Sequence, residues 1–203
     1  GDILELDAPA DLLVVSSYSG NYEPLENTLM GALAEKGKNV EQAMEQPALD
    51  MRTSLRGAFS HPTGHPHIQR LLVLEMKSTS HFENKGLDLE AIFTDLEICL
   101  SVAAKKDMPL KHIIIPLLGT GTQQIPVRKI ASLLPRFAAN ALNEQPSLER
   151  ISFIDRSEEK IKMLSGELNN LLGRSELALV SHDYAELLRK SIGKNLAFLK
   201  ERA

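Results

Sequence analysis

Along the chain, short runs of consecutive apolar residues alternate with stretches in which apolar residues recur every three or four positions. The runs at residues 12–15, 71–74 and 113–118 are typical of buried strands, and residues 151–154 predict a further strand. Residues 177–180 predict one more short strand. Because helical spacing separates these runs, the pattern predicts an α/β sandwich in which helices cover a largely parallel sheet.

Helices are predicted in the first half of the chain from apolar spacing and from breaker residues. The first helix is expected to begin near Pro24 and to stop at Gly37. A short helix is expected over residues 40–44 and a long one over residues 89–103, whose apolar residues form a single face. Residues 49–59 fit a strand or a turn, and the sequence does not decide between them.

Three more helices are predicted in the second half. Pro126 suits the first turn of a helix, whereas Pro135 within the same stretch is expected to kink the helix or split it in two. Ser157 predicts the N-cap of the next helix, and Glu158 after it is favourable near the positive end of the helix dipole. The last helix is expected over residues 184–199.

Length and composition narrow the class of protein. The 203 residues fit one domain, and 43% apolar with 25% charged residues is an ordinary globular composition. A formal charge of −4 argues against a dedicated nucleic-acid-binding protein. No apolar run is long enough for a membrane span and no signal peptide opens the chain, so we expect a cytoplasmic domain. Since the chain begins with Gly1 rather than Met, we expect residues 1–203 to be a domain excised from a longer protein.

The strongest candidate for a binding site follows the most apolar strand. The sequence Gly-Thr-Gly-Thr at residues 119–122 ends the run at 113–118 and precedes the helix that opens at Pro126. Glycines let the backbone approach an anion closely, and successive N–H groups at a helix start favour phosphate. The spacing is that of neither a P-loop nor a dinucleotide-binding fingerprint, so a purely structural turn is the alternative.

This stretch resembles the second ligand loop of macro domains, the ADP-ribose-binding family. The resemblance rests on residues 114–121 followed by four residues and then Pro126. The opening Gly-Asp-Ile-Leu of residues 1–4 and the Asp-Leu-Leu-Val-Val of residues 11–15 are similar to the family's Gly-Asp-Ile-Thr and Asp-Ala-Ile-Val-Asn. The run at 151–154 falls where the family places its last core strand. The resemblance covers about residues 1–170 and is most specific at the glycine loop.

The resemblance implies a three-layer α/β/α sandwich with a mixed, largely parallel central sheet and a site for ADP-ribose or a related nucleotide. It implies that Asp2 accepts a hydrogen bond from the adenine amino group. No further cofactor and no metal is expected. The implied first ligand loop comprises Ser16, Ser17 and Tyr18. The implied second loop, which would hold the phosphates, comprises Gly119, Thr120, Gly121, Thr122 and Gln123.

The first loop departs from that of the family's hydrolases, which carry asparagines at the positions of Val15 and Tyr18 and a run of glycines after them. Those residues place the distal ribose and the attacking water. We therefore expect a reader or sensor that regulates an attached effector domain, as in macro-like domains of bacterial immune systems that respond to nucleotide signals. Two alternatives are an ADP-ribosyl hydrolase with other residues in this loop, and a non-catalytic, structural domain that mediates assembly into a homo-oligomer.

Two clusters of chemically capable residues have simpler explanations. His61, His65 and His67 have a spacing that zinc accepts, but their stretch is rich in proline and glycine and predicts a surface loop. Arg52 and Arg56 are four residues apart and would form an anion clamp on a helix. A solvated face or a structural ion pair is the more ordinary explanation for this arginine pair.

Four single residues complete the candidates. Tyr18 and Tyr22 flank a Ser-Gly-Asn turn at a strand end, where a ring either covers a ligand or packs over the neighbouring helix. Tyr18 is the better candidate because it is nearer the strand end. Cys99 falls on the apolar face of its helix and is expected in the core. Asp155 follows a core strand and is most simply explained as the end of that strand. Its side chain is also able to reach a ligand at the glycine loop, which leaves the sheet at the same edge.

Overall fold

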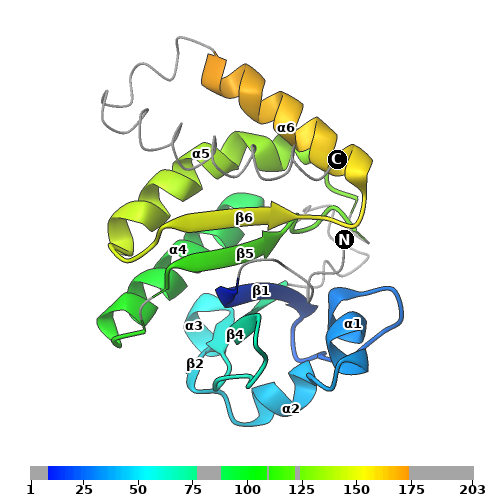
Figure 1. Cartoon of the computed structure of the whole chain (residues 1–203), viewed down its shortest axis with the longest axis vertical. Coiled ribbons are helices and arrows are strands. Elements are labelled where there is room, and N and C mark those ends of the chain that lie inside the picture. Colours follow the sequence, from blue (N-terminus) through cyan, green and yellow to red (C-terminus); the bar gives the residue numbers. More distant parts are fainter. Residues whose placement is uncertain (1–8, 77–87, 109, 122–123, 174–203) are drawn as a thin grey trace.

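The computed structural model describes residues 9–76, 88–108, 110–121 and 124–173. A single sheet of six strands in the order β2-β3-β4-β1-β5-β6 runs through its centre (Figure 1). Strands β1, β4, β5 and β6 are parallel, whereas β2 and β3 join antiparallel at one edge. The strands are β1 (Ala10–Tyr18), β2 (Leu49–Met51), β3 (Gly57–Phe59), β4 (Ile68–Met76), β5 (His112–Pro116) and β6 (Arg150–Ile154).

Helices cover both faces of this sheet. One face carries α1 (Leu29–Glu35) and α2 (Val40–Glu45), and the other carries α4 (Leu89–Lys105), α5 (Val127–Glu144) and α6 (Glu158–Gly173) (Figure 1). The four-residue helix α3 (Arg52–Leu55) connects β2 to β3. The expected three-layer α/β/α sandwich with a mixed, largely parallel sheet is therefore confirmed.

The strand β1 shows why the central runs are apolar without interruption. Leu12 and Val14 belong to the core under α4 and α5, whereas Leu13 and Val15 belong to the core under α1 and α2. Successive side chains of a strand point to opposite faces, so a strand with helices on both sides needs apolar residues at every position. The predicted central strands are confirmed for this reason.

Two expectations about the first half change in detail. The first helix begins at Leu29 rather than near Pro24, because Thr28 caps it by accepting a hydrogen bond from the Gly31 N–H at 3.0 Å. Residues 49–59, which the sequence left open, form β2, α3 and β3. These strands pair with the edge of β4 and complete the sheet.

In the second half, Pro126 is the N-cap of α5 and stands one residue before the helix begins. The helix continues through Pro135, so the expectation of a split is wrong. Pro135 is buried, and α5 packs against both α4 and α6. This packing offsets the backbone hydrogen bond that a proline removes from a helix. The strand and helix expected at residues 177–180 and 184–199 lie outside the described residues.

Candidate functional site

The carboxyl ends of the parallel strands bring the two candidate loops to one edge of the sheet. Tyr18, the last residue of β1, pairs in register with Met76 of β4. Strand β5 pairs with β1 through Leu12 and Ile113. Because β1 and β5 are adjacent and parallel, the loops that follow Tyr18 and Pro116 leave the sheet at the same edge. Ligands of open α/β sheets bind at this edge, beyond the carboxyl ends of the strands.

The glycine loop after β5 is a tight turn held by its own backbone. The Thr120 N–H donates to the Leu117 carbonyl at 3.2 Å, and the Ile125 N–H donates to the Gly119 carbonyl at 2.9 Å. Gly119 has φ of +78°, a conformation that strongly favours glycine. Gly121 has no positive φ, and a side chain there would meet no atom within 4 Å. The turn itself therefore requires glycine at 119, whereas the space beside Gly121 is open.

The backbone donors of this loop are the groups best suited to an anion. Within the described residues, no acceptor takes a hydrogen bond from the N–H groups of Leu118, Gly119 or Gly121. Gly121 is exposed and Gly119 is half-buried. Backbone N–H groups that converge in a turn form the kind of concavity in which proteins bind phosphates.

Two charged side chains, Asp155 after β6 and Lys160 of α6, contact the glycine loop. The hydroxyl of the buried Thr120 lies 3.0 Å from Asp155 Oδ2 and 2.9 Å from the Leu117 carbonyl oxygen, either of which can accept its proton. Lys160 Nζ donates to the Thr120 carbonyl oxygen at 3.0 Å and lies 3.7 Å from Asp155 Oδ2. Asp155 also accepts from the Ser157 N–H at the start of α6. It thus lies at the glycine loop, as its place after β6 suggested.

The first loop, after β1, is tied to a carboxylate that sequence reasoning missed. Glu75 of β4 is only 9% exposed and accepts hydrogen bonds from the Ser19 hydroxyl at 2.9 Å, from the Gly20 N–H at 3.2 Å and from the Tyr22 hydroxyl. Arg52 donates to the same Tyr22 oxygen at 2.9 Å. Burial, with the Glu75 carboxylate beside it, raises the pKa of Tyr22 above its usual value. The sequence signal that could have revealed Glu75 is an acidic residue within the apolar stretch of β4.

The predicted residues of the first loop lie along the end of β1. Tyr18 is 41% exposed, whereas Ser16 is half-buried. Ser17 is buried, and within the described residues its hydroxyl has no hydrogen-bond partner. The structure thus brings Tyr18 to the same edge as the glycine loop, and a contact with ligand stays a prediction for all three. The predicted residues Asp2, Thr122 and Gln123 lie outside the described residues.

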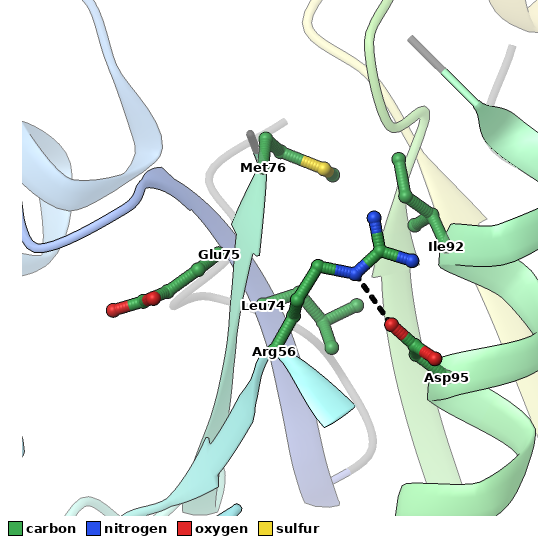
Figure 2. Close-up of a pocket in the computed structure, with 6 residues that line it drawn as sticks. All are labelled: Arg56, Leu74, Glu75, Met76, Ile92 and Asp95. Atoms are coloured by element: carbon green, nitrogen blue, oxygen red, sulfur yellow. Dashed lines mark hydrogen bonds and ion pairs between the residues drawn. The ribbon is translucent and has the colours of Figure 1, made fainter. Parts of the chain in front are cut away.

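Arg52 and Arg56 do not form an anion clamp, because each is paired with a different carboxylate. Arg52 is bonded to Asp50, and Arg56 Nε donates to Asp95 Oδ2 at 2.5 Å. The alternative of structural ion pairs is therefore confirmed. Figure 2 shows the Arg56 pair between β4 and α4, with Glu75 pointing away from it.

A hollow beside the Arg56–Asp95 pair is too small for a nucleotide. It encloses about 140 Å³, including space open to solvent, and Met76 and Ile92 are among its lining residues (Figure 2). Ligand pockets usually measure about 300–1,000 Å³. The carboxyl edge of the sheet is therefore the better candidate for a ligand site.

Neither the histidine stretch nor the cysteine adds a reactive centre. His65 and His67 lie in a loop, where the His67 N–H donates to His65 Nδ1 at 3.2 Å. The described part of the chain contains no cluster of three or more residues arranged to hold a metal. Cys99 is buried, and burial raises the pKa of its thiol to about 12. Its expected place in the core is confirmed.

Comparison with solved structures decides the fold family. The macrodomain of Oceanobacillus iheyensis, as an alanine mutant, aligns with a TM-score of 0.60 at 14% sequence identity, over 85% of this chain and 90% of that one. The same macrodomain with MES bound aligns with a TM-score of 0.58 at 16% identity, over 85% and 89% of the two chains. The chain has a macrodomain fold. At this identity the macrodomain likeness establishes the architecture alone.

Other comparisons add little to this macro-like fold. The structure of Thermosipho africanus DarTG in complex with ADP-ribose aligns with a TM-score of 0.46 at 14% identity, over 74% of this chain and 40% of that one, a likeness too weak to support an inference. No family model and no curated protein matches the sequence. None of the described helices is both long and apolar enough to cross a membrane.

Proposed function

We propose that this macro-like domain binds ADP-ribose or a related nucleotide at the carboxyl edge of its sheet, with the glycine loop around the phosphates. The observation that carries the proposal is the pair of backbone donors at Gly119 and Gly121, which have no hydrogen-bond acceptor within the described residues and are not buried. These donors lie at the edge where open α/β sheets bind ligands, on a fold shared with macrodomains. Charge-assisted hydrogen bonds from N–H groups to phosphate oxygens are stronger than neutral ones.

The exposed ring of Tyr18 and the first loop, which Glu75 holds in place, are suited to form the opposite side of this site. Tyr18 ends β1 at the edge of the sheet from which the glycine loop leaves, and an exposed aromatic ring there is suited to covering a sugar or base. The first loop lacks the asparagines of the family's hydrolases at Val15 and Tyr18. We therefore propose binding and sensing rather than hydrolysis, with occupancy passed to an attached effector domain, and bacterial defence as the setting suggested by the resemblance.

The test uses a glycine at which the fold leaves room. The substitution Gly121→Glu places a carboxylate in the open space beside the loop without backbone strain, so it blocks an anion while leaving the fold intact. Gly166→Glu is the matched control, because it adds the same group at an exposed position of α6 with equally open surroundings. Calorimetric titration with ADP-ribose, AMP and NAD measures binding to the wild type and to both variants.

We expect saturable binding of ADP-ribose to the wild type and to Gly166→Glu, and a loss of at least about tenfold in Gly121→Glu, since a like charge at a phosphate site is repulsive. No binding of any ligand to the wild type would refute the proposal. Equal binding by Gly121→Glu would place the site elsewhere. Release of free ADP-ribose from a modified protein, lost in Gly121→Glu, would establish hydrolysis instead of sensing.

A further inference from the structure

Lys160 stands where helices disfavour a cation. It is the third residue of α6, directly after the Ser157 N-cap, Glu158 and Glu159. The first turn of a helix carries partial positive charge and favours acids, and a capping box places Glu or Gln at this position. A lysine here therefore needs compensating contacts. Its ammonium group makes such contacts with Thr120 of the glycine loop and with Asp155.

The ammonium group of Lys160 binds two atoms of Thr120 and pairs with Asp155. It donates to the Thr120 carbonyl oxygen at 3.0 Å and to the Thr120 hydroxyl oxygen at 3.3 Å, and it pairs with Asp155 at 3.7 Å. Two of the three N–H donors of the ammonium group thus bind Thr120, and the ion pair with Asp155 holds the group beside the glycine loop.

The contact with the Thr120 carbonyl determines the direction of the next backbone donor. The described backbone contains no cis peptide bond, so the N–H of Gly121 points opposite to the carbonyl of Thr120 across a planar peptide. Since Lys160 of α6 holds that carbonyl, the Gly121 N–H points away from Lys160. A flipped peptide would present its carbonyl oxygen there instead and would repel an anion.

We propose that Lys160 is a positioning residue that orients the Thr120–Gly121 peptide for a phosphate-bearing ligand. It acts through Thr120 and does not touch the ligand, while Asp155 holds the ammonium in place. The bonded Thr120 N–H and Gly121 carbonyl belong to the adjacent peptides, so within the described residues Lys160 is the donor that binds the Thr120 carbonyl itself. This inference rests on the proposed function and names the residue that preorganises its anion site.

The test compares two lysines of the same helix. Lys160→Met removes the contact with Thr120, whereas Lys162→Met removes the same charge from a side chain that is 70% exposed and paired with Glu158 on the surface. Lys160→Arg keeps a cationic donor at the position. Calorimetry measures ADP-ribose affinity, NMR titration measures the weaker binding of phosphate-free adenosine, and spectra of glycine-¹⁵N-labelled protein report the Gly121 amide without ligand.

We expect Lys160→Met to weaken ADP-ribose binding about tenfold, the effect of one hydrogen bond to a charged group, and to leave adenosine binding unchanged. The Gly121 amide resonance should shift in Lys160→Met and stay in place in Lys162→Met. Lys160→Arg should retain most of the affinity, which separates loss of the donor from loss of packing.

Three results would overturn the inference. They are unchanged ADP-ribose affinity in Lys160→Met, an equal loss for adenosine and ADP-ribose, and an unmoved Gly121 resonance. Any of these, with a wild type that binds ADP-ribose, leaves the proposed function standing. A wild type that does not bind at all refutes the proposed function and removes the role of Lys160 with it.

Discussion

The contact between Gly57 and Cys99 gives a sharp test of how β3 packs against α4. A β-carbon added at Gly57 would lie 2.6 Å from Cys99 Sγ, and 3.5 Å from side-chain carbons of Leu72 and Leu74. The two leucine contacts are ordinary, whereas the sulfur contact is about 1 Å closer than the usual 3.5–4.0 Å between packed atoms. The backbone at Gly57 has no positive φ, so Gly57→Ala tests this single overlap.

The expected size of the effect follows from burial. Cys99 is fully buried and Gly57 is buried as well, so neither can move toward solvent. Forcing an extra methyl group into a packed core costs about 1–3 kcal/mol of unfolding free energy. Cys99→Ala removes the sulfur at a cost of about 1 kcal/mol, in the range of other small buried deletions. In the double variant the methyl group added by Gly57→Ala occupies the vacated space, so we expect the penalties to cancel by about 1–2 kcal/mol.

Urea unfolding followed by circular dichroism, on the wild type, both single variants and the double variant, measures this coupling. The transition midpoints should change while the slope with denaturant stays constant, because the unfolded surface is the same. Additive penalties, within about 0.5 kcal/mol, would refute the overlap. A Gly57→Ala variant as stable as the wild type would show that β3 and α4 do not approach as closely as the structure has them.

Two further predictions concern buried polar groups. Burial lowers the pKa of His112 below its usual 6.5, so the stability that its neutral form contributes is present above about pH 6.5 and is lost as the pH falls through the lower folded value. His112→Gln should therefore lose less stability than the wild type between pH 7.5 and 5, measured by urea unfolding. Parallel pH dependences of the two proteins would contradict this prediction. Glu75→Gln places an amide N–H₂ among the donors Ser19, Gly20 and Tyr22 and should cost about 1–3 kcal/mol in the same assay. It should also speed hydrogen exchange at the Gly20 amide, and unchanged exchange would argue against Glu75 as the anchor of the first loop.

Local sequence preferences were sufficient to predict an element where its burial depends on the pattern of its own residues. The run at 113–118 predicted β5 because only a strand covered on both faces is apolar at every position. The apolar face of α4 was visible for the same kind of reason, since its spacing matches the helical repeat. Pro135 shows the limit of such rules, because the packing of α5 decided that its helix continues.

The candidate site was predictable in part. The glycine loop was found because Gly119 and Gly121 are small residues at a strand end, which is a local signal. Its supports were not found, because Lys160 and Thr120 are 40 residues apart and the Tyr22–Glu75 contact joins residues 53 apart. Lysine and glutamate are common on solvated helices and strands, so only contact with a distant partner distinguishes these two.

By itself, the sequence determined the alternation of the main helices and strands, the largely parallel sheet that this alternation implies and the position of the glycine loop, because each depends on periodicity and turn chemistry within a few residues. The tertiary structure alone decided that residues 49–59 complete the sheet as an antiparallel edge, that Glu75 anchors the first loop, and that Lys160 holds the Thr120 peptide. These features depend on which surfaces meet when the strands align. Burial stabilises these tertiary contacts, and no local sequence pattern specifies which residues form them.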